Sequence, residues 1–415
     1  MKIGYAQKEI TPKIGTKLAG YGVEQISNEV HDPLMVRVMV IRTQPRATIL
    51  VQTDLIGISR DIVDQFAKKL KARRNQIMIC CTHTHSGPVG TVGLEGLESI
   101  FGNENPEYIE YWLEQATRCY MEAQLKSSET EVAYAQVLAS NIGSDRHDGT
   151  QGDDHLSVWV FKQANGSKYL LYNFACHPTI MNGVNLKITA DLPYGVIEEL
   201  ENDYKGIMFI NGSAGDISTR FTRQDSSFDE VKRKGKLLAG YIREATTDLT
   251  FEPVTNVEIK QEEFPVKIKA APDINEVKSK LQAQELLVEK AKKANADETE
   301  IRVLYSVVEG YKALIDSIPA LNQFQGITLT VTFMKINDNI LIGIPVELFS
   351  KLSDKYHEID KRLHFVSYCN GYYMYLTNEI AFEKNYYESG TSIFEKGEGE
   401  NLMNSIYTKF KELNW

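Results

Sequence analysis

The sequence is poor in cysteine, and this excludes two kinds of small architecture. Its 415 residues include only five cysteines, an odd number, and none form a Cys-x-x-Cys pair. A disulfide framework or a cysteine zinc knuckle is therefore not expected. Cys80, Cys81 and Cys176 lie in or beside apolar runs, so we expect buried thiols rather than a nucleophile.

Long apolar segments are also missing. No run approaches the roughly 18 residues of a membrane-spanning helix. Residues 1–9 lack the apolar core of a signal peptide. We therefore expect no integral membrane segment and a cytoplasmic location, or secretion if a leader precedes the natural chain.

The third feature that the sequence lacks is a block of basic residues. The chain has 46 Lys and Arg against 56 Asp and Glu, a net charge of −10. Because phosphate binding depends on clustered cations, nucleic acid is not expected as a partner. The composition, 42% hydrophobic and 25% charged, is that of a globular protein with a large core. It leaves the oligomeric state open.

Short apolar runs alternate with amphipathic helical segments along the chain. The expected strands are residues 36–41, 48–52, 76–81, 156–161, 169–174, 206–211 and 341–344. The expected helices are residues 60–70, 106–122, 192–204, 230–245 and 346–358. This alternation predicts an α/β fold of mixed β-sheets flanked by helices. With no repeat and no Gly/Ser- or Pro-rich linker, residues 1–415 are treated as one domain.

Residues 272–318 differ in composition from the rest of the chain. They are rich in Glu, Lys and Ala at helical spacing, and residues 294–297 form a plausible turn. We predict a charged helical hairpin inserted into the fold, with a solvated outer face. A lid or an oligomerisation arm is the alternative.

Two of the eight histidines, His83 and His85, follow the apolar run at residues 77–79. In an extended segment, residues i and i+2 point to the same side, so both rings can face one pocket. Imidazole is a common metal ligand and proton carrier. The pair is thus a candidate metal or acid/base site, or two hydrogen-bonded loop residues.

Other polar residues follow three further expected strands. His177 follows residues 169–174, a small-residue loop with Ser218 follows residues 206–211, and Glu347 follows residues 341–344. Ligands of open α/β sheets bind outside the carboxyl ends of strands. Three histidines, a serine loop and a glutamate there predict a zinc site for hydrolysis. Singly, each has a plainer interpretation: a hydrogen-bonded histidine, a tight turn, or a carboxylate in a first helical turn.

In this order, these motifs resemble the neutral/alkaline, non-lysosomal ceramidase family, over most of the chain and in its N-terminal catalytic domain. The resembling segments are residues 82–88, 173–177, 211–218, 345–347, 372–377 and 385–392. The resemblance implies four zinc ligands: His83, His177, Glu347 and Tyr375. A tyrosine ligand must lose its proton, which a divalent cation promotes.

The resemblance also implies roles beside the metal. His85 lines the site and Tyr387 contacts the reacting carbonyl. Arg146 matches an arginine that holds the substrate, and Ser218 matches a serine considered as a nucleophile. Gly215 and Asp216, in the same loop as Ser218, are candidate substrate-binding residues.

One residue departs from the family pattern. Arg220 stands where the serine loop of the family usually continues with Pro-Asn. A cation beside the site suggests a substrate with an anionic group, so Arg220 is a third candidate substrate-binding residue.

The expected activity is zinc-dependent hydrolysis of the amide bond of an N-acyl substrate, ceramide-like or other. His85 is the candidate base for a metal-bound water. Tyr387, with Ser218 or loop N–H groups, stabilises the oxyanion. The alternatives are covalent attack by Ser218, a metal hydrolase of a non-lipid amide or ester, and a metal-binding protein without turnover.

Overall fold

The computed structural model describes residues 1–21, 25–42, 46–93, 102–322 and 326–415. Its largest sheet has nine strands, in the order β11-β9-β8-β6-β1-β3-β4-β5, with β13 also paired to β6. The strands are β1 (Lys2–Glu9), β3 (Met35–Arg42), β4 (Ala47–Thr53), β5 (Ile77–Cys81), β6 (Ser128–Leu138), β8 (His155–Gln163), β9 (Lys168–Phe174), β11 (Gly206–Asn211) and β13 (Glu252–Pro253).

This sheet is mixed. The β4–β5 and β9–β11 pairs are parallel, and the pairs between them are antiparallel. A second, four-stranded sheet, β14-β15-β16-β18, packs against it. Its strands are β14 (Val257–Val266), β15 (Ile327–Ile336), β16 (Asn339–Gly343) and β18 (Leu363–Val366). Apolar side chains of both sheets, such as Met39 and Met334, form one buried cluster between them.

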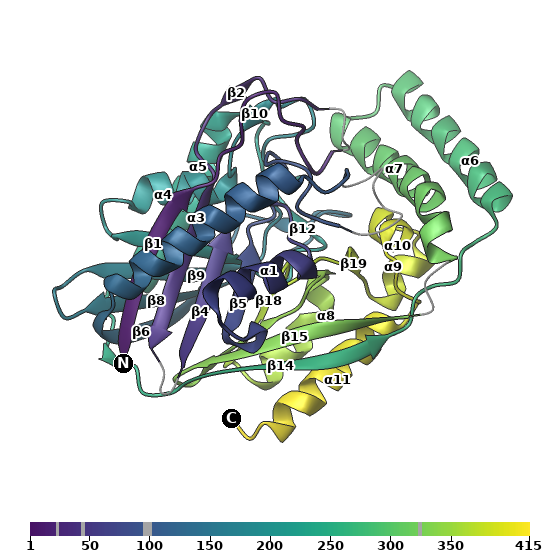
Figure 1. Ribbon diagram of the computed structural model, residues 1–415. Helices are drawn as coiled ribbons and strands as arrows, with labels where there is room; N and C mark the ends of the chain where they lie inside the picture. Colours follow the sequence, from purple (N-terminus) through teal and green to yellow (C-terminus); the bar gives the residue numbers. More distant parts are fainter. Residues whose placement is uncertain (22–24, 43–45, 94–101, 323–325) are drawn as a thin grey trace.

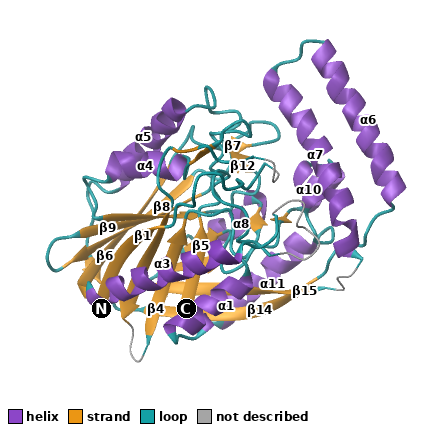
Figure 2. Ribbon diagram, turned by 45° about the horizontal axis from the view of Figure 1, so that its top comes forward, coloured by secondary structure: helices purple, strands orange, loops and turns teal. Residues whose placement is uncertain are grey.

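Helices cover the outer faces of the two sheets (Figures 1 and 2). On the large sheet lie α1 (Arg60–Leu70), α3 (Pro106–Leu125), α4 (Leu192–Leu200) and α5 (Phe228–Ala245). On the smaller sheet lie α8 (Ser350–Ile359) and α11 (Glu398–Glu412). The layers are therefore helix, sheet, sheet and helix, which confirms the predicted α/β class with mixed sheets.

Several short strands and helices lie near the carboxyl ends of β5, β9 and β11, the strands that are followed by the predicted site residues. They are β2 (Glu29–Val30), β7 (Ser144–Asp145), β10 (Lys187–Ile188), β12 (Ile217–Ser218), β17 (Glu347–Leu348), β19 (Tyr375–Leu376), α9 (Glu379–Glu383) and α10 (Tyr387–Thr391). A 3₁₀ turn, η1 (Arg74–Gln76), precedes β5. The expected helix over residues 346–358 is wrong at its start: Glu347 lies in β17, and α8 begins at Ser350.

The predicted helical hairpin is present as α6 (Ile274–Lys293) and α7 (Glu298–Leu321), and it projects from the body of the molecule (Figure 1). Its second helix continues past the predicted end at residue 318. A Cβ atom at Gly310 would lie 3.3 Å from the Tyr387 backbone, so α7 packs closely on α10. The single-domain assignment stays a prediction.

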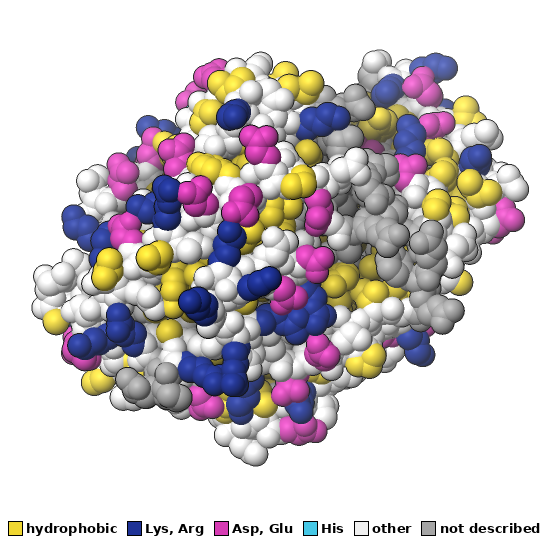
Figure 3. All heavy atoms as spheres, in the orientation of Figure 1, with side chains coloured by type: hydrophobic (Ala, Val, Ile, Leu, Met, Phe, Trp, Pro, Cys, Tyr) yellow, Lys and Arg dark blue, Asp and Glu magenta, His cyan; other side chains and the backbone are white. Residues whose placement is uncertain are grey.

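Three expectations about composition can be compared with the structure. All five cysteines are buried and free, which confirms the predicted burial of Cys80, Cys81 and Cys176. No helix among the described residues is long and apolar enough to cross a membrane. Acidic and basic side chains are interspersed over the face seen in Figure 3.

Candidate metal centre and active site

The structure brings the predicted metal ligands together from distant parts of the chain. His83 follows β5 and His177 follows β9. Glu347 and Tyr375 are paired residues in the parallel ladder of β17 and β19. Two strand ends and one short ladder thus build the centre of the site.

The backbone and the ring of His83 are both held in place. Its φ angle is +68°, in the left-handed region that residues other than glycine seldom occupy. Its Nδ1 lies 2.7 Å from the carbonyl oxygen of Ile56, and its ring stacks on Tyr368 with 4.0 Å between centroids. These contacts direct Nε2 toward the cluster. Such strain at a candidate site is consistent with a functional constraint.

His177 is oriented in the same manner. Its Nδ1 lies 2.5 Å from the carbonyl oxygen of Ala214, which leaves Nε2 free to face Glu347 Oε2 at 3.0 Å. Metal-binding histidines commonly donate their second ring N–H to a backbone carbonyl or a carboxylate, which fixes the tautomer. Both His83 and His177 have this arrangement.

Glu347 lies between the two histidines and is 2% exposed. Its Oε2 is 3.0 Å from His177 Nε2 and 3.3 Å from His83 Nε2, while Oε1 accepts a hydrogen bond from the Tyr372 hydroxyl. Burial opposes its ionisation, but the charge of His83 and a hydrogen bond from His177 hold its pKa well below the usual range. Glu347 is therefore a carboxylate ready to bind a cation.

The spacing of these atoms fits a metal ion. His83 Nε2 has no hydrogen-bond partner among the described residues, although Glu347 Oε2 is 3.3 Å away. Ligands about 2.0 Å from a tetrahedral zinc ion are separated by about 3.3 Å along each edge of the tetrahedron. The donor set of imidazole nitrogen and carboxylate oxygen is one that zinc prefers.

His85 lies in the same cluster. Ligand atoms of His83, His85 and His177 are within 4.8 Å of one another. Neither ring nitrogen of His85 has a partner among the described residues. Burial, with the charges of the other two histidines, lowers its pKa well below the usual imidazole value, so the ring is neutral. Its predicted role as a base stays a prediction, and its position also suits a metal ligand.

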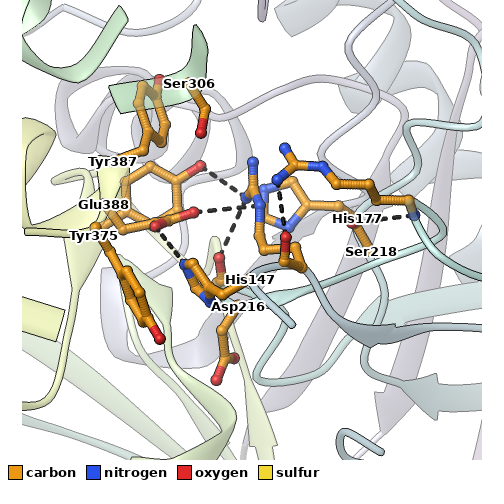
Figure 4. Close-up of polar contacts among 12 residues, drawn as sticks. His147, His177, Asp216, Ser218, Ser306, Tyr375, Tyr387 and Glu388 are labelled. Atoms are coloured by element: carbon orange, nitrogen blue, oxygen red, sulfur yellow. Dashed lines mark hydrogen bonds and ion pairs between the residues drawn. The ribbon is translucent and has the colours of Figure 1, made fainter. Parts of the chain in front are cut away.

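Tyr375 lies at the opposite side of the cluster from Ser218 (Figure 4). Its ring stacks on His177 with centroids 6.3 Å apart, and its hydroxyl accepts a hydrogen bond from Arg146 Nη1 at 3.4 Å. The ring of Tyr387 meets it edge-on, with 5.9 Å between centroids. Burial and the charge of Glu347 raise the pKa of Tyr375. The structure thus places Tyr387 and Arg146 beside the predicted tyrosine ligand.

Arg146 belongs to a buried ionic network that sequence reasoning missed. Its Nε is 3.2 Å from Glu388 Oε1, and the other oxygen of Glu388 lies 2.8 Å from His147 Nε2. Asp145 holds the Nδ1 of the same ring at 2.8 Å. Burial opposes the charge of His147, but Glu388 and Asp145 raise its pKa to about 9. In the sequence, His147 directly follows Arg146 and Glu388 directly follows Tyr387. Adjacency to predicted site residues is the one sequence signal that could have pointed to this network.

Ser218 lies at the rim of the centre, in β12. The strand register pairs it with Ser144, and an isolated bridge joins it to His177. Its Oγ accepts a hydrogen bond from the backbone N–H of Arg220 at 3.4 Å. In the described part of the chain no histidine or carboxylate is hydrogen-bonded to this hydroxyl. A serine nucleophile needs such a base, so the geometry favours attack by water.

Gly215 and Asp216 have structural contacts. The N–H of Gly215 donates to the Leu348 carbonyl at 2.8 Å, and a Cβ there would lie 2.9 Å from the carbonyl oxygen of Glu347. The carboxylate of Asp216 accepts hydrogen bonds from the N–H and hydroxyl of Ser350, at 2.7 and 2.9 Å, at the start of α8. It points away from His177 (Figure 4). The predicted contact of Gly215 and Asp216 with substrate stays a prediction.

Comparison with known proteins gives matches in structure only. No family model and no curated protein matches the sequence. The neutral ceramidase from Pseudomonas aeruginosa superposes with a TM-score of 0.77 at 17% identity, over 97% of this chain and 73% of that one. A structure described as ceramidase complexed with C2 gives a TM-score of 0.74 at 19% identity, with the same two coverages. The chain therefore has an α/β fold of the neutral ceramidase type, and the predicted resemblance is confirmed at the level of the fold.

Proposed function

We propose that this protein is a metal-dependent hydrolase that cleaves the amide bond of an N-acyl substrate. The observation that carries the proposal is the approach of His83 Nε2 and His177 Nε2 to one oxygen of Glu347, at 3.3 and 3.0 Å, with His83 Nε2 lacking a hydrogen bond among the described residues. The fold shared with ceramidases supports an amide as the substrate bond.

The metal in this proposal is zinc, held by His83, His177, Glu347 and Tyr375. When bound, zinc polarises a carbonyl and lowers the pKa of water. The remaining ligand candidate, His85, has no partner on either ring nitrogen among the described residues, and in this proposal it accepts a proton next to the metal.

Other residues of the chain position the substrate and the developing charge. The Tyr387 hydroxyl donates a hydrogen bond to the oxyanion in this proposal, and Ser218 is a second donor. Arg146 holds the Tyr375 hydroxyl and is itself fixed by Glu388. These donors are already held in place in the folded protein, which is how enzymes stabilise transition-state charge at little reorganisation cost.

A hydrolysis screen tests the proposal. Purified protein, before and after removal of metal by a chelator, is incubated with N-acyl amides of several acyl lengths, ceramide included, and with matched esters. We expect amide hydrolysis that is lost with the metal and restored by zinc. Hydrolysis of esters alone favours a metal-dependent ester hydrolase. Stoichiometric metal binding without turnover favours a metal-binding protein that is not an enzyme.

A further inference from the structure

Two arginines beside the site lack an acidic partner among the residues that the structure describes. The half-buried Arg220 uses Nη1 to donate to the Arg146 carbonyl at 2.8 Å. The half-buried Arg223 donates to the Thr179 carbonyl at 2.6 Å. Over the described residues, neither guanidinium has a carboxylate oxygen within 4.0 Å. In the described part of the chain, neither charge is therefore balanced by a direct ion pair.

The surroundings of Arg220 add further positive charge. Burial, the charge of Arg146 and then that of Arg302 lower the pKa of Arg220 to about 9, and Arg223 acts in the same direction. Glu388 opposes them but is shared between Arg146 and His147.

Arg302 lies on α7 of the inserted hairpin and is paired with Glu309 at 2.7 Å. The hairpin thus brings an ion pair to this side of the site, and the cation of that pair acts on Arg220.

Short contacts connect this positive region to the candidate metal centre. The guanidinium of Arg220 contacts the backbone of Arg146, and the Arg146 side chain contacts the Tyr375 hydroxyl. The backbone N–H of Arg220 contacts Ser218 Oγ. An anion held by Arg220 would therefore lie on the side of the centre formed by Arg146 and Ser218.

An unpaired charge in a partly desolvated site is costly unless a counter-ion binds there. Arginine presents a planar set of donors that matches carboxylates and other oxyanions. We propose that the substrate carries an anionic group next to its scissile amide and that Arg220, assisted by Arg223, binds that group. This inference rests on the proposed amide hydrolysis. It specifies that the substrates of that reaction are anionic amides.

Two matched pairs of substrates test the inference. N-octanoylglycine and N-octanoylethanolamine differ by an anion on the amine side of the amide. N-octylsuccinamate and N-octylbutanamide differ by an anion on the acyl side. For the zinc-loaded wild-type enzyme we expect kcat/KM at least about tenfold higher for the anionic member of one pair, since charge-assisted bonds to arginine are the stronger ones.

Variants assign this preference to residues. Arg220→Gln should reduce the preference at least about fivefold, mainly by raising KM for the anionic substrate; Arg223→Gln should act similarly but less. Arg118→Gln is the matched control, since Arg118 is exposed on α3 and paired with Glu114. Arg220→Lys keeps the charge and should keep part of the preference if Arg220→Gln folds poorly.

Calorimetric binding of N-octanoylglycine and N-octanoylethanolamine provides a readout that does not depend on turnover. Tighter binding of the glycine compound, weakened by Arg220→Gln, supports the inference even if no amide is cleaved, an outcome that contradicts only the proposed function. Equal binding and equal kcat/KM within both pairs overturn the inference while amide hydrolysis stands. A preference that Arg220→Gln and Arg223→Gln both leave intact overturns it as well.

Discussion

Glu347 and Tyr375 lie directly opposite each other in a parallel ladder of two residues per strand. The ladder joins segments 28 residues apart in the sequence and brings a buried carboxylate beside a buried phenol. Because the backbone N–H of Glu347 also donates to the Met374 carbonyl at 2.9 Å, the two side chains are held on a rigid scaffold. This pairing makes a four-ligand metal site possible.

Replacing Tyr375 should weaken the metal site. Tyr375→Phe removes one proposed ligand and the acceptor for Arg146, so we expect metal affinity to fall at least about tenfold, the lower end of losses seen when metal-site contacts are removed. Metal titration and kcat/KM measure the effect. Tyr373→Phe is the control, because Tyr373 is a neighbouring half-buried tyrosine outside the cluster. An unchanged Tyr375→Phe affinity contradicts the assignment of this ligand.

Replacing Tyr387 should affect the chemical step and leave the metal in place. Loss of one oxyanion donor typically lowers kcat by about 10²–10³, and Tyr387→Phe should do so with normal metal content. Tyr305→Phe is the control, because Tyr305 is an exposed tyrosine on α7, the hairpin helix that packs on α10. If Tyr387→Phe instead loses its metal, Tyr387 belongs to the coordination site and its proposed role is wrong.

The packing of α7 on α10 should influence activity through Tyr387. A Cβ at Gly310 meets the backbone and ring of Tyr387 at 3.3 Å, whereas one at Gly240 meets nothing within 4 Å. Both glycines lie within helices, where Gly→Ala ordinarily adds about 1 kcal/mol of stability. We expect Gly240→Ala to gain this stability with normal kcat, and Gly310→Ala to gain less and to lower kcat. Denaturant unfolding measures the stability and steady-state kinetics measures kcat. Equal changes in the two variants would contradict an effect of the α7–α10 packing on activity.

The His147–Glu388 pair should contribute stability over a defined pH range. The raised pKa of His147, about 9, means that its contribution is complete below the unfolded value near 6.5 and is lost as pH rises through about 9. The lowered pKa of Glu388, about 2, means that its contribution is complete above about 4.5 and is lost as pH falls toward 2.

Urea unfolding of wild type and His147→Gln from pH 5 to pH 10 measures the contribution of His147. We expect the wild type to be more stable by on the order of 2–3 kcal/mol at pH 6, with the difference shrinking between pH 6.5 and 9. A difference that is constant over this range would show that the ring is not charged in the folded protein.

Much of the site could be predicted from local sequence patterns. His83 and His177 follow apolar runs that form strands, and the alternation of runs and helices predicted the α/β class with mixed sheets. The helix assigned over residues 346–358 was wrong because Glu347 is drawn into a ladder with Tyr375, a long-range pairing that no local pattern encodes. The strands β14 and β15 were also missed: β14 carries many charged residues and stays partly exposed, whereas β15 is buried on both faces.

The ionic network could not be predicted for a similar reason. His147 and Glu388 are separated by 241 residues, and although each follows a predicted site residue, no local pattern pairs them. Glu388 lies on α10, which packs closely on α7 at Gly310 and Gly390. Residues that orient others through tertiary contacts therefore became visible only in the folded chain.

The most direct test of the central claim is the metal content of the purified protein, determined by elemental analysis after dialysis against zinc. The proposed site predicts about one zinc ion per chain in the wild type and near-complete loss in His83→Ala and Glu347→Gln, with both variants still folded by circular dichroism. A wild-type protein that binds no zinc, or variants that retain the full complement, would contradict a metal centre built on His83, His177 and Glu347.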